Sequence, residues 1–427
     1  MRSRPRPLPT AMGLVCLVAC TPPPSMDHSA ESYVKLVLAL GQHDPDYVDA
    51  YYGPSQWRAD AAAESLSVET IRARADGLGR DLDRVPDPTD PMVVLRLRYL
   101  RKQVASLRAR AAMLLGDVMT FDEESMVLYD AVAPANRFAS FDATIAQLDQ
   151  RLPGTGAVQP RYTRYRDRFV IPADRLDAVF RRAIDECRDR TTRFLELPAG
   201  ERFAIEYVTG KSWSGYNWYQ GNAASLIQVN TDLPVYIDRA VDLACHEGYP
   251  GHHVYNLMLE RHLAIDRGWV EFSVYPLFSP QSLIAEGSAN YGIEMAFPGA
   301  ERVTFERDVL FPLAGLDPAG AESYYAIQDL VGRLSYAGNE VARNLLEGEI
   351  SEEQAASWLE RYALMGPERA RQRVRFIQQY RAYVINYNLG KDLVARYVER
   401  EAGDDVAARW RVFGALLGSP RLPSGLR

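Results

Sequence analysis

Three of the six histidines in this 427-residue chain lie within one stretch of eight residues. The stretch reads His-Glu-Gly-Tyr-Pro-Gly-His-His, from His246 to His253, and it places Glu247 directly after its first histidine. Histidine is the commonest protein ligand of zinc, and zinc peptidases keep a glutamate beside a ligating histidine as their general base. These residue types therefore favour zinc-dependent hydrolysis, in which Glu247 takes a proton from the attacking water.

The spacing of the histidines requires a break in the helix that carries them. On an unbroken helix, a residue seven positions after His246 lies on nearly the same face but roughly 10 Å further along the axis. A zinc ion with Zn–N bonds of about 2.1 Å cannot join two such side chains. Residues 248–251 contain two glycines and a proline, which interrupt helices. We expect a loop there that brings His252, or else His253, beside His246; a helix end with solvent-facing histidines is the alternative.

A third ligand is expected from another element. The segment Leu283–Glu294 predicts a helix on which Glu286 and Asn290 share one face. A carboxylate on a helix packed against the histidine helix completes the ligand set of one class of zinc peptidase. We expect Glu286 in that position, with Asn290 and His253 supporting the ligands, Asn290 through a histidine's free ring nitrogen. A surface glutamate followed by a glycine break is the alternative.

Three strings of this sequence together resemble one bacterial family. They are HEGYPGHH from His246, EGSANYG from Glu286 and YNLGKDL from Tyr387, and they are similar to the family called domain of unknown function 885. The resemblance extends from about residue 29 to the C-terminus. It implies a largely helical zinc metallopeptidase with one zinc ion per chain. The implied ligands are His246, His252 and Glu286, and the implied base is Glu247.

The rest of the sequence predicts a mostly α fold with one small β region. Helical periodicity dominates. The Pro/Gly-rich stretch 152–172 separates a predicted N-terminal helical lobe, residues 29–160, from a catalytic lobe, residues 161–427; one continuous domain is the alternative. Residues 203–208 and 224–230 predict strands of a hairpin or small sheet, which would offer an edge strand to an extended peptide. The aromatic residues between these strands are expected either to contact substrate or to form a small core: Trp213, Tyr216, Trp218 and Tyr219.

A tyrosine near the C-terminus is the candidate for stabilising negative charge during catalysis. Apolar residues at three- and four-residue steps predict one long helix over residues 370–387, with Tyr387 facing inward and Tyr383 one turn earlier. A phenol near the metal can donate a hydrogen bond to the oxygen of the attacked carbonyl. We expect Tyr387 to have this catalytic role; a core tyrosine with a satisfied hydroxyl is the alternative.

The N-terminus predicts export and a lipid anchor. A basic start and a short apolar run end in Leu-Val-Ala-Cys, which resembles a bacterial lipoprotein signal. Residues 1–19 would be cleaved, Cys20 lipidated, and residues 20–28 left as an extended tether at the periplasmic face of the cell envelope. An ordinary cleaved signal is the alternative. Beyond this region only Cys187 and Cys245 remain; neither belongs to a zinc-type cysteine pair, and they could form a disulfide.

Composition excludes one class of partner. The net charge of -7 gives no concentrated basic surface, so nucleic acid is not expected to bind. The predicted partners are a peptide substrate and, through the lipid anchor, a membrane. Two other functions stay open: hydrolysis of a different amide or ester of the cell envelope at the same metal, and a metal-binding helical lipoprotein without activity.

Overall fold

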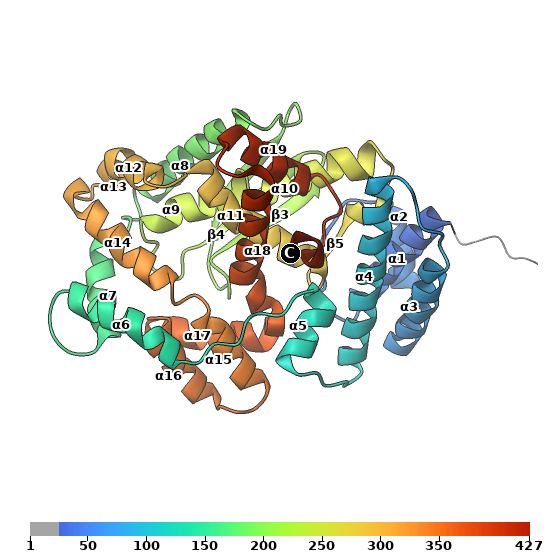
Figure 1. Ribbon diagram of the computed structural model, residues 1–427, viewed down its shortest axis with the longest axis horizontal. Coiled ribbons are helices and arrows are strands. Elements are labelled where there is room, and N and C mark those ends of the chain that lie inside the picture. Colours follow the sequence, from blue (N-terminus) through green and yellow to red (C-terminus); the bar gives the residue numbers. More distant parts are fainter. Residues whose placement is uncertain (1–24) are drawn as a thin grey trace, which may run out of the picture.

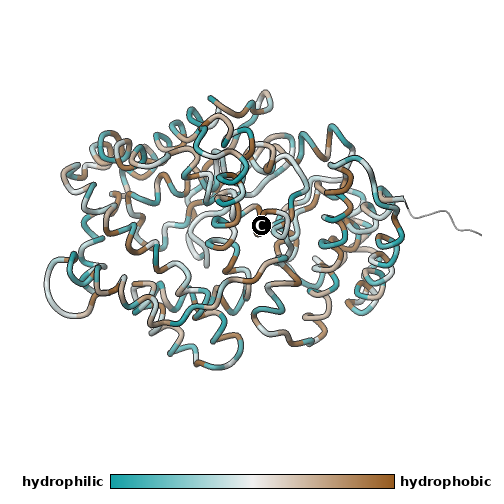
Figure 2. Tube along the Cα trace, in the orientation of Figure 1, coloured by the Kyte–Doolittle hydropathy of each residue, from teal (hydrophilic) through white to brown (hydrophobic). Residues whose placement is uncertain are grey.

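A computed structural model describes residues 25–427, and it is built mostly of α-helices (Figure 1), as predicted. The predicted signal peptide and the lipidation site Cys20 lie outside the described residues. Residues 26–28, predicted to belong to the tether, instead form the first turn of α1 (Met26–Leu40). Hydrophobic and hydrophilic residues alternate along the helices (Figure 2), and among the described residues no helix is long and apolar enough to cross a membrane.

The first helices pack together at one end of the molecule, drawn in blue and cyan in Figure 1. They are α1, α2 (Ser55–Glu64), α3 (Val68–Asp83), α4 (Pro91–Leu114) and α5 (Phe121–Tyr129). Helix α5 begins with a capping box, in which Thr120 and Glu123 satisfy each other's backbone amide. Next come α6 (Ala139–Arg151), α7 (Val158–Arg166) and α8 (Leu176–Thr192).

The small β region is a three-stranded sheet rather than two strands with a loop between them. Its strands are β2 (Arg202–Val208), β3 (Gly215–Gly221) and β4 (Ala224–Asn230), in the order β2-β4-β3. Strand β2 is parallel to β4, whereas β3 is antiparallel to it. A tight turn joins β3 to β4 through Asn222 and Ala223, both at positive φ, as a two-residue hairpin turn requires. In this strand order β3 is an edge strand. A separate antiparallel pair joins β1 (Val48–Tyr51) to β5 (Val274–Pro276).

Two helices from distant parts of the sequence form the centre of the molecule (Figure 1): α11 (Pro280–Ala296) and α18 (Ile385–Ala402). They make the most extensive contact between any two elements of the described chain. Their backbones meet at Gly287 and Gly390, where a Cβ on Gly287 would overlap the backbone of Gly390. Only glycine at this crossing lets the helices come so close.

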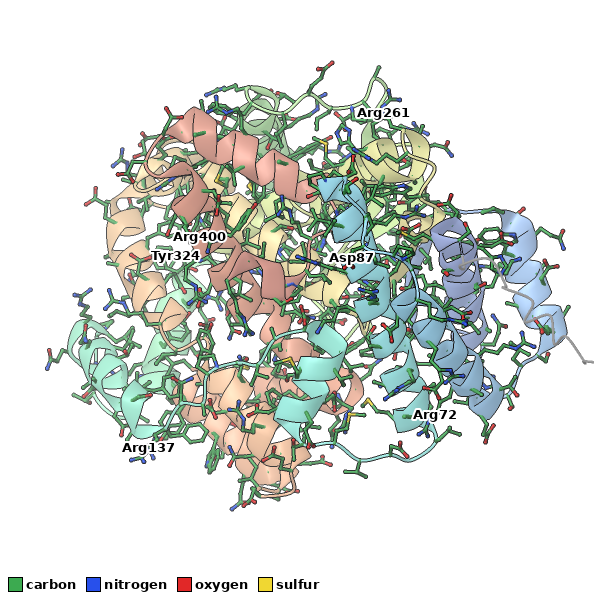
Figure 3. All side chains as sticks on the ribbon, turned by 45° about the vertical axis from the view of Figure 1, so that its right-hand side comes forward. Arg72, Asp87, Arg137, Arg261, Tyr324 and Arg400 are labelled. Carbon is green, nitrogen blue, oxygen red and sulfur yellow. A yellow bond between two sulfur atoms is a disulfide. The ribbon has the colours of Figure 1, made fainter. Side chains whose placement is uncertain are left out.

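The remaining helices surround this pair. They are α9 (Asp238–Leu243), α10 (His252–Leu259), α12 (Glu301–Phe305), α13 (Phe311–Ala314), α14 (Ala321–Gly332), α15 (Ala337–Leu346), α16 (Glu352–Tyr362), α17 (Pro367–Tyr380) and α19 (Val406–Leu417). One contiguous hydrophobic core includes buried residues from α1 through to the C-terminal helices. Charged side chains such as Arg72, Arg137 and Arg261 lie at the periphery (Figure 3).

The prediction of one unbroken helix over residues 370–387 is wrong. Helix α17 ends at Tyr380, a short 3-10 turn follows, and α18 begins at Ile385. Arg381 has a positive φ of 52° with ψ at −125°, a backbone conformation that is costly for a residue with a side chain. The buried carboxylate of Glu124 holds this break, because it accepts hydrogen bonds from Arg381 Nε at 2.7 Å and from the Ala382 amide at 3.1 Å.

Candidate metal centre

The eight-residue motif is folded as an interrupted helix, as its glycines and proline predict. After α9 the chain continues as a short π-helix, Ala244–Gly248, which contains His246 and Glu247. The Tyr249–Pro250 bond is cis, and α10 begins at His252. At Gly251 a Cβ would overlap the carbonyl oxygens of Cys245 and His246, so no other residue fits this turn. The turn brings the second histidine back beside the first.

The structure brings His246, His252 and Glu286 together. The Nε2 atoms of the two histidines lie 3.2 Å apart. Oε2 of Glu286 lies 3.3 Å from His246 Nε2, and Oε1 lies 3.6 Å from His252 Nε2. One ligand-type atom from each residue falls within 4.8 Å of the others, so the three side chains converge on a single point.

The electrostatics of this cluster suit a bound cation. Oε2 of Glu286 is buried and accepts no well-aligned hydrogen bond from the described residues, although His246 Nε2 lies 3.3 Å away. Burial alone would raise the pKa of Glu286, but His252 and His246 hold it well below its usual range. Burial would lower the pKa of His252, yet the charges of Glu286, Glu247 and Asp49 raise it to about 9. Two imidazoles and one carboxylate, with the carboxylates of Glu247 and Asp49 nearby, are a donor set that fits Zn²⁺.

Tyr383 holds the carboxylate of Glu286 in place, a contact that the sequence did not identify. Its hydroxyl, which is buried, donates a hydrogen bond of 2.7 Å to Oε1 of Glu286. The predicted supporting residue Asn290 does not contact a histidine. Its side-chain amide donates to the carbonyl oxygens of Glu286 and Tyr387, at 3.1 and 3.2 Å, and so links α11 to α18.

His253 points away from the cluster and anchors α10 to the sheet. Its Nδ1 lies 2.8 Å from Ser225 Oγ on β4, and its Nε2 lies 3.1 Å from Glu201 Oε2. Glu201 also accepts hydrogen bonds from Tyr249 and Arg188. Burial would raise the pKa of Glu201, but these three donors lower it to about 2. His253 therefore supports the helix that carries His252 and does not touch the ligands.

The Glu247 carboxylate and the Tyr387 hydroxyl are two further polar groups that face the cluster. Glu247 is 4 % exposed. Its Oε1 packs against Gly215 at the start of β3: a Cβ atom added to Gly215 would lie only 2.9 Å from this oxygen. Tyr387 is partly buried, and burial together with the charge of Glu286 raises the pKa of its hydroxyl well above the usual range. Within residues 25–427 no side chain hydrogen-bonds to either the Glu247 carboxylate or the Tyr387 hydroxyl.

Three of the four predicted substrate-contacting aromatic residues form a row, and the fourth does not join it. The ring centroids of Trp213 and Tyr216 lie 5.4 Å apart, and those of Tyr216 and Trp218 lie 4.6 Å apart. Trp218 is 43 % exposed. Tyr219 lies on the opposite face of β3, where it is buried and its hydroxyl donates to Glu260. The alternation of side chains along a strand accounts for this separation.

Asp49 on β1 is an acidic neighbour of the cluster that the sequence did not reveal. Its carboxylate accepts a hydrogen bond from the Tyr216 hydroxyl. Burial raises the pKa of Asp49 to about 6, with further contributions from the charges of Glu286 and Glu247. No spacing signal could have found it, because β1 lies almost two hundred residues before the histidine motif.

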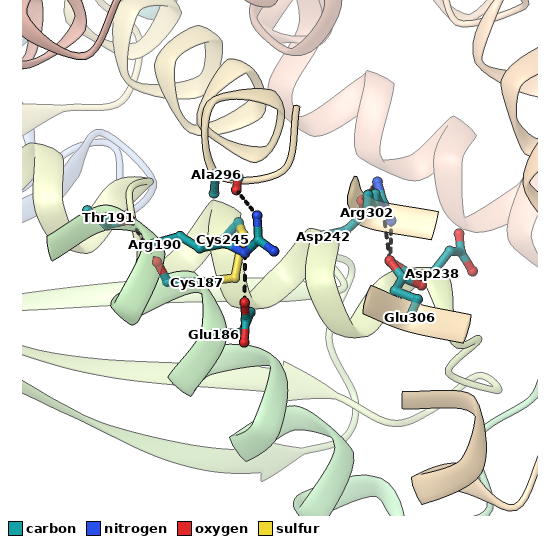
Figure 4. The surroundings of a disulfide bond; sticks show 10 residues. All are labelled: Glu186, Cys187, Arg190, Thr191, Asp238, Asp242, Cys245, Ala296, Arg302 and Glu306. Atoms are coloured by element: carbon teal, nitrogen blue, oxygen red, sulfur yellow. Dashed lines mark hydrogen bonds and ion pairs between the residues drawn. A yellow bond between two sulfur atoms is a disulfide. The ribbon is translucent and has the colours of Figure 1, made fainter. Parts of the chain in front are cut away.

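A disulfide joins Cys187 on α8 to Cys245, the residue directly before His246 (Figure 4). The Cα atoms of the two cysteines lie 5.7 Å apart, and 58 residues separate them in the sequence. Next to the bridge, Arg190 pairs with Glu186 and donates to the carbonyl of Ala296 (Figure 4). The π-helical turn that carries His246 is thus fastened covalently to α8.

One solved structure shares the overall fold with a TM-score above 0.5. A protein from Colwellia psychrerythraea, whose crystal structure is described as that of a "putative lipoprotein", superposes with a TM-score of 0.52 at 15% identity, over 86% of this chain and 70% of that one. A "putative lipoprotein of unknown function" from Shewanella oneidensis gives 0.45 at 13% identity, over 84% and 75% of the two chains, and a protein called BsuCP gives 0.49 at 10% identity, over 92% and 88%. No family model matches the sequence, and no curated protein is significantly similar to it. At such low identity these similarities bear on the fold alone.

Proposed function

We propose that this protein is a zinc metallopeptidase in which His246, His252 and Glu286 hold one zinc ion. The observation that carries the proposal is the convergence of the three side chains, with Oε2 of Glu286 buried and without a well-aligned hydrogen bond in the described chain. A buried carboxylate oxygen without a partner is costly unless a cation or a proton satisfies it. The motif resemblance to the family called domain of unknown function 885 supports the same assignment.

The zinc ion, when bound, would lower the pKa of a water molecule and polarise the substrate carbonyl. Glu247 follows the ligand His246 in the chain, and its free carboxylate takes a proton from the attacking water. When the C–N bond breaks, Glu247 passes that proton to the leaving amine. The Tyr387 hydroxyl donates a hydrogen bond to the oxygen on which negative charge develops. Strand β3, whose Gly215 lies against Glu247, is at the edge of its sheet and would align an extended peptide.

The proposed location is the bacterial cell envelope, with a lipid attached at Cys20. The Leu-Val-Ala-Cys sequence supports this proposal, and so does the disulfide, because disulfides persist in exported proteins. The neighbours from Colwellia and Shewanella, both described as lipoproteins, agree with it.

Elemental analysis of the mature domain tests the metal. We expect about one zinc per chain, and we expect His246→Ala and Glu286→Ala to lose it. His262→Ala is the matched control, because His262 is an exposed histidine outside the cluster. Folded protein that cannot take up added zinc would refute the proposal.

Hydrolysis of a peptide library, run beside cell-envelope fragments, tests the activity. Glu247→Gln keeps the side chain's shape but cannot accept the proton, so we expect zinc to stay bound and turnover to fall by about 10²–10⁴-fold. Unchanged turnover with zinc bound would rule out Glu247 as the base. Turnover of envelope fragments but not of peptides would replace the peptidase by an amidase or esterase.

A further inference from the structure

Arg373, on α17, is a partly buried arginine without an acidic partner. The arginines of residues 25–427 that are not exposed lie within 4.0 Å of a carboxylate, with only two exceptions, Arg373 and Arg421. Residues 1–24 contain no aspartate or glutamate that could supply one. A partly desolvated guanidinium that lacks a counter-ion has an unmet demand for an anion.

The position of Arg373 is next to the proposed catalytic groups. Its guanidinium carbon lies 5.7 Å from the centroid of the Tyr387 ring. The Tyr387 ring lies 5.8 Å from that of Tyr383, whose hydroxyl contacts Glu286. Arg421, by contrast, packs on Tyr397, nearly three helical turns further along α18, and donates to Ser419. The unpaired charge near the metal centre is thus that of Arg373.

A second guanidinium lies one helical turn earlier on α17. Arg369 donates hydrogen bonds to Ser214 Oγ at 2.7 Å and to Gln372 Oε1 at 2.9 Å, but to no carboxylate of the described chain. Ser214 directly precedes Gly215, the residue of β3 that touches Glu247. Crowding by surrounding protein atoms and the neighbouring charges of Arg239, Arg373 and Arg166 lower the pKa of Arg369 to about 10, although its side chain is exposed to solvent.

The two other guanidiniums of this group already have partners. Arg166 pairs with Asp238 at 3.1 Å, and Arg239 pairs with Asp242 at 2.9 Å. Of these four guanidiniums, only those of Arg369 and Arg373 have no carboxylate partner in the described chain. An arginine binds a carboxylate through two parallel hydrogen bonds, so an incoming carboxylate is the ligand that this arrangement fits.

We propose that Arg373, assisted by Arg369, binds the C-terminal carboxylate of the substrate, so that the enzyme removes residues from the C-terminal end of peptides. The inference rests on the proposed peptidase activity and specifies its substrate. Water adds to the carbonyl before the terminal residue or residues, the C–N bond breaks, and the leaving amine takes the proton that Glu247 carries. A terminal carboxylate sits at a fixed number of bonds from the cleaved bond, whereas an acidic side chain occurs only in some peptides.

Paired substrates test this specificity directly. N-blocked peptides with a free C-terminal carboxylate are compared with the same peptides as C-terminal amides, and with amides that carry an aspartate near the C-terminus. We expect kcat/KM for the plain amides to be about 10- to 100-fold lower than for the acids, the loss that one charge-assisted pair accounts for. Equal cleavage of acids and plain amides would overturn the inference. It would also be overturned if only the aspartate-containing amides were cleaved at the full rate, because the enzyme would then recognise an acidic side chain and not the C-terminal carboxylate.

Variants of α17 assign the effect to Arg373. Arg373→Gln should lower cleavage of the acids to the level of the amides and leave the amides and the zinc content unchanged. Arg373→Lys should recover part of the loss because it keeps the charge. Arg375→Gln is the control, since Arg375 is an exposed arginine on the same helix. A parallel loss on acids and amides in Arg373→Gln would show a structural role and refute the assignment.

A binding measurement separates failure of this inference from failure of the proposed function. Zinc-loaded Glu247→Gln should hold the peptide acids at least about 10-fold more tightly than the amides in calorimetry, and this preference should vanish when Arg373→Gln is added. If the preference is seen but the wild type cleaves nothing, the carboxylate site stands and the peptidase proposal fails. If the wild type cleaves peptides but binding shows no preference, the carboxylate site fails.

Discussion

The hydroxyl of Tyr383 donates to Oε1 of Glu286, and the same oxygen lies 3.6 Å from Nε2 of His252. The other oxygen, Oε2, faces His246 at 3.3 Å. Tyr383 thus fixes the orientation of the carboxylate so that each oxygen is directed to one histidine. The proposed metal centre thus depends on a residue from a segment that lies about a hundred positions after Glu286, whose carboxylate it orients.

Removal of this hydroxyl should weaken zinc binding without abolishing it. Tyr383→Phe keeps the ring but frees Oε1, and loss of such a supporting contact typically lowers metal affinity by about 10- to 100-fold. A competition titration with a zinc chelator measures the change. Tyr387→Phe is the matched comparison: it should leave zinc affinity intact but lower kcat by about 10²–10³-fold, as loss of an oxyanion donor does. The reverse pattern would exchange the roles of the two tyrosines.

A methyl group at the crossing of α11 and α18 should destabilise the protein. In Gly287→Ala the new Cβ meets the backbone of Gly390, which cannot rotate away, so we expect the free energy of unfolding to fall by about 1–3 kcal/mol or more. Urea denaturation measures it. Gly338→Ala on α15 is the control, because no atom lies within 4 Å of its Cβ position; a change of about 0.5–1 kcal/mol towards greater stability is expected there. Equal effects of the two substitutions would contradict the close backbone contact.

Loss of the disulfide should lower stability as well. The bridge closes a loop between positions 58 residues apart, for which chain entropy predicts about 4 kcal/mol of stabilisation. The double variant Cys187→Ser with Cys245→Ser should therefore unfold at a lower denaturant concentration than the oxidised wild type. Adding a reductant to the wild type should reproduce the shift, while the variant should not respond to it. A reductant-insensitive wild type would mean that the two thiols are not joined in the protein.

The pair formed by Glu201 and His253 should make the free energy of unfolding depend on pH in the acidic range. The pKa of Glu201 is about 2 in the folded protein, below the value of about 4.3 in an unfolded chain. Its ionised form therefore stabilises the fold fully above about pH 5, and this contribution disappears as the pH falls towards 2. The difference in unfolding free energy between wild type and Glu201→Gln should be about 2 kcal/mol at pH 6 and should shrink below pH 4. Glu196→Gln, at an exposed carboxylate nearby, should show no such trend.

The sequence was sufficient to predict the parts of the candidate site that lie close together along the chain. The glycines and proline between His246 and His252 predict the interruption that the structure contains, and helical spacing correctly directs Glu286 inward. It was not sufficient for contacts between distant segments. Asp49 and Arg373 carry no local pattern, since their importance arises from what the fold brings beside them.

Local patterns were also misleading where a tertiary contact outweighs them. The apolar period continues through residues 380–385, so it predicts an unbroken helix, whereas the buried Glu124 from α5 stabilises a residue with positive φ there. Asn290 has the right spacing to support a histidine, yet the closeness of α18 gives its amide two backbone carbonyl oxygens instead.

The break at Arg381 divides the proposed machinery into two mechanical parts. Glu286 and Tyr387 belong to helices whose backbones touch at Gly287 and Gly390, and this contact fixes their relative position. Arg373 lies on the other side of the break, on a helix joined to α18 through a short turn. Substitutions along α17 can therefore alter the surroundings of Arg373, the proposed carboxylate-binding residue, while Glu286 and Tyr387 keep their relative positions.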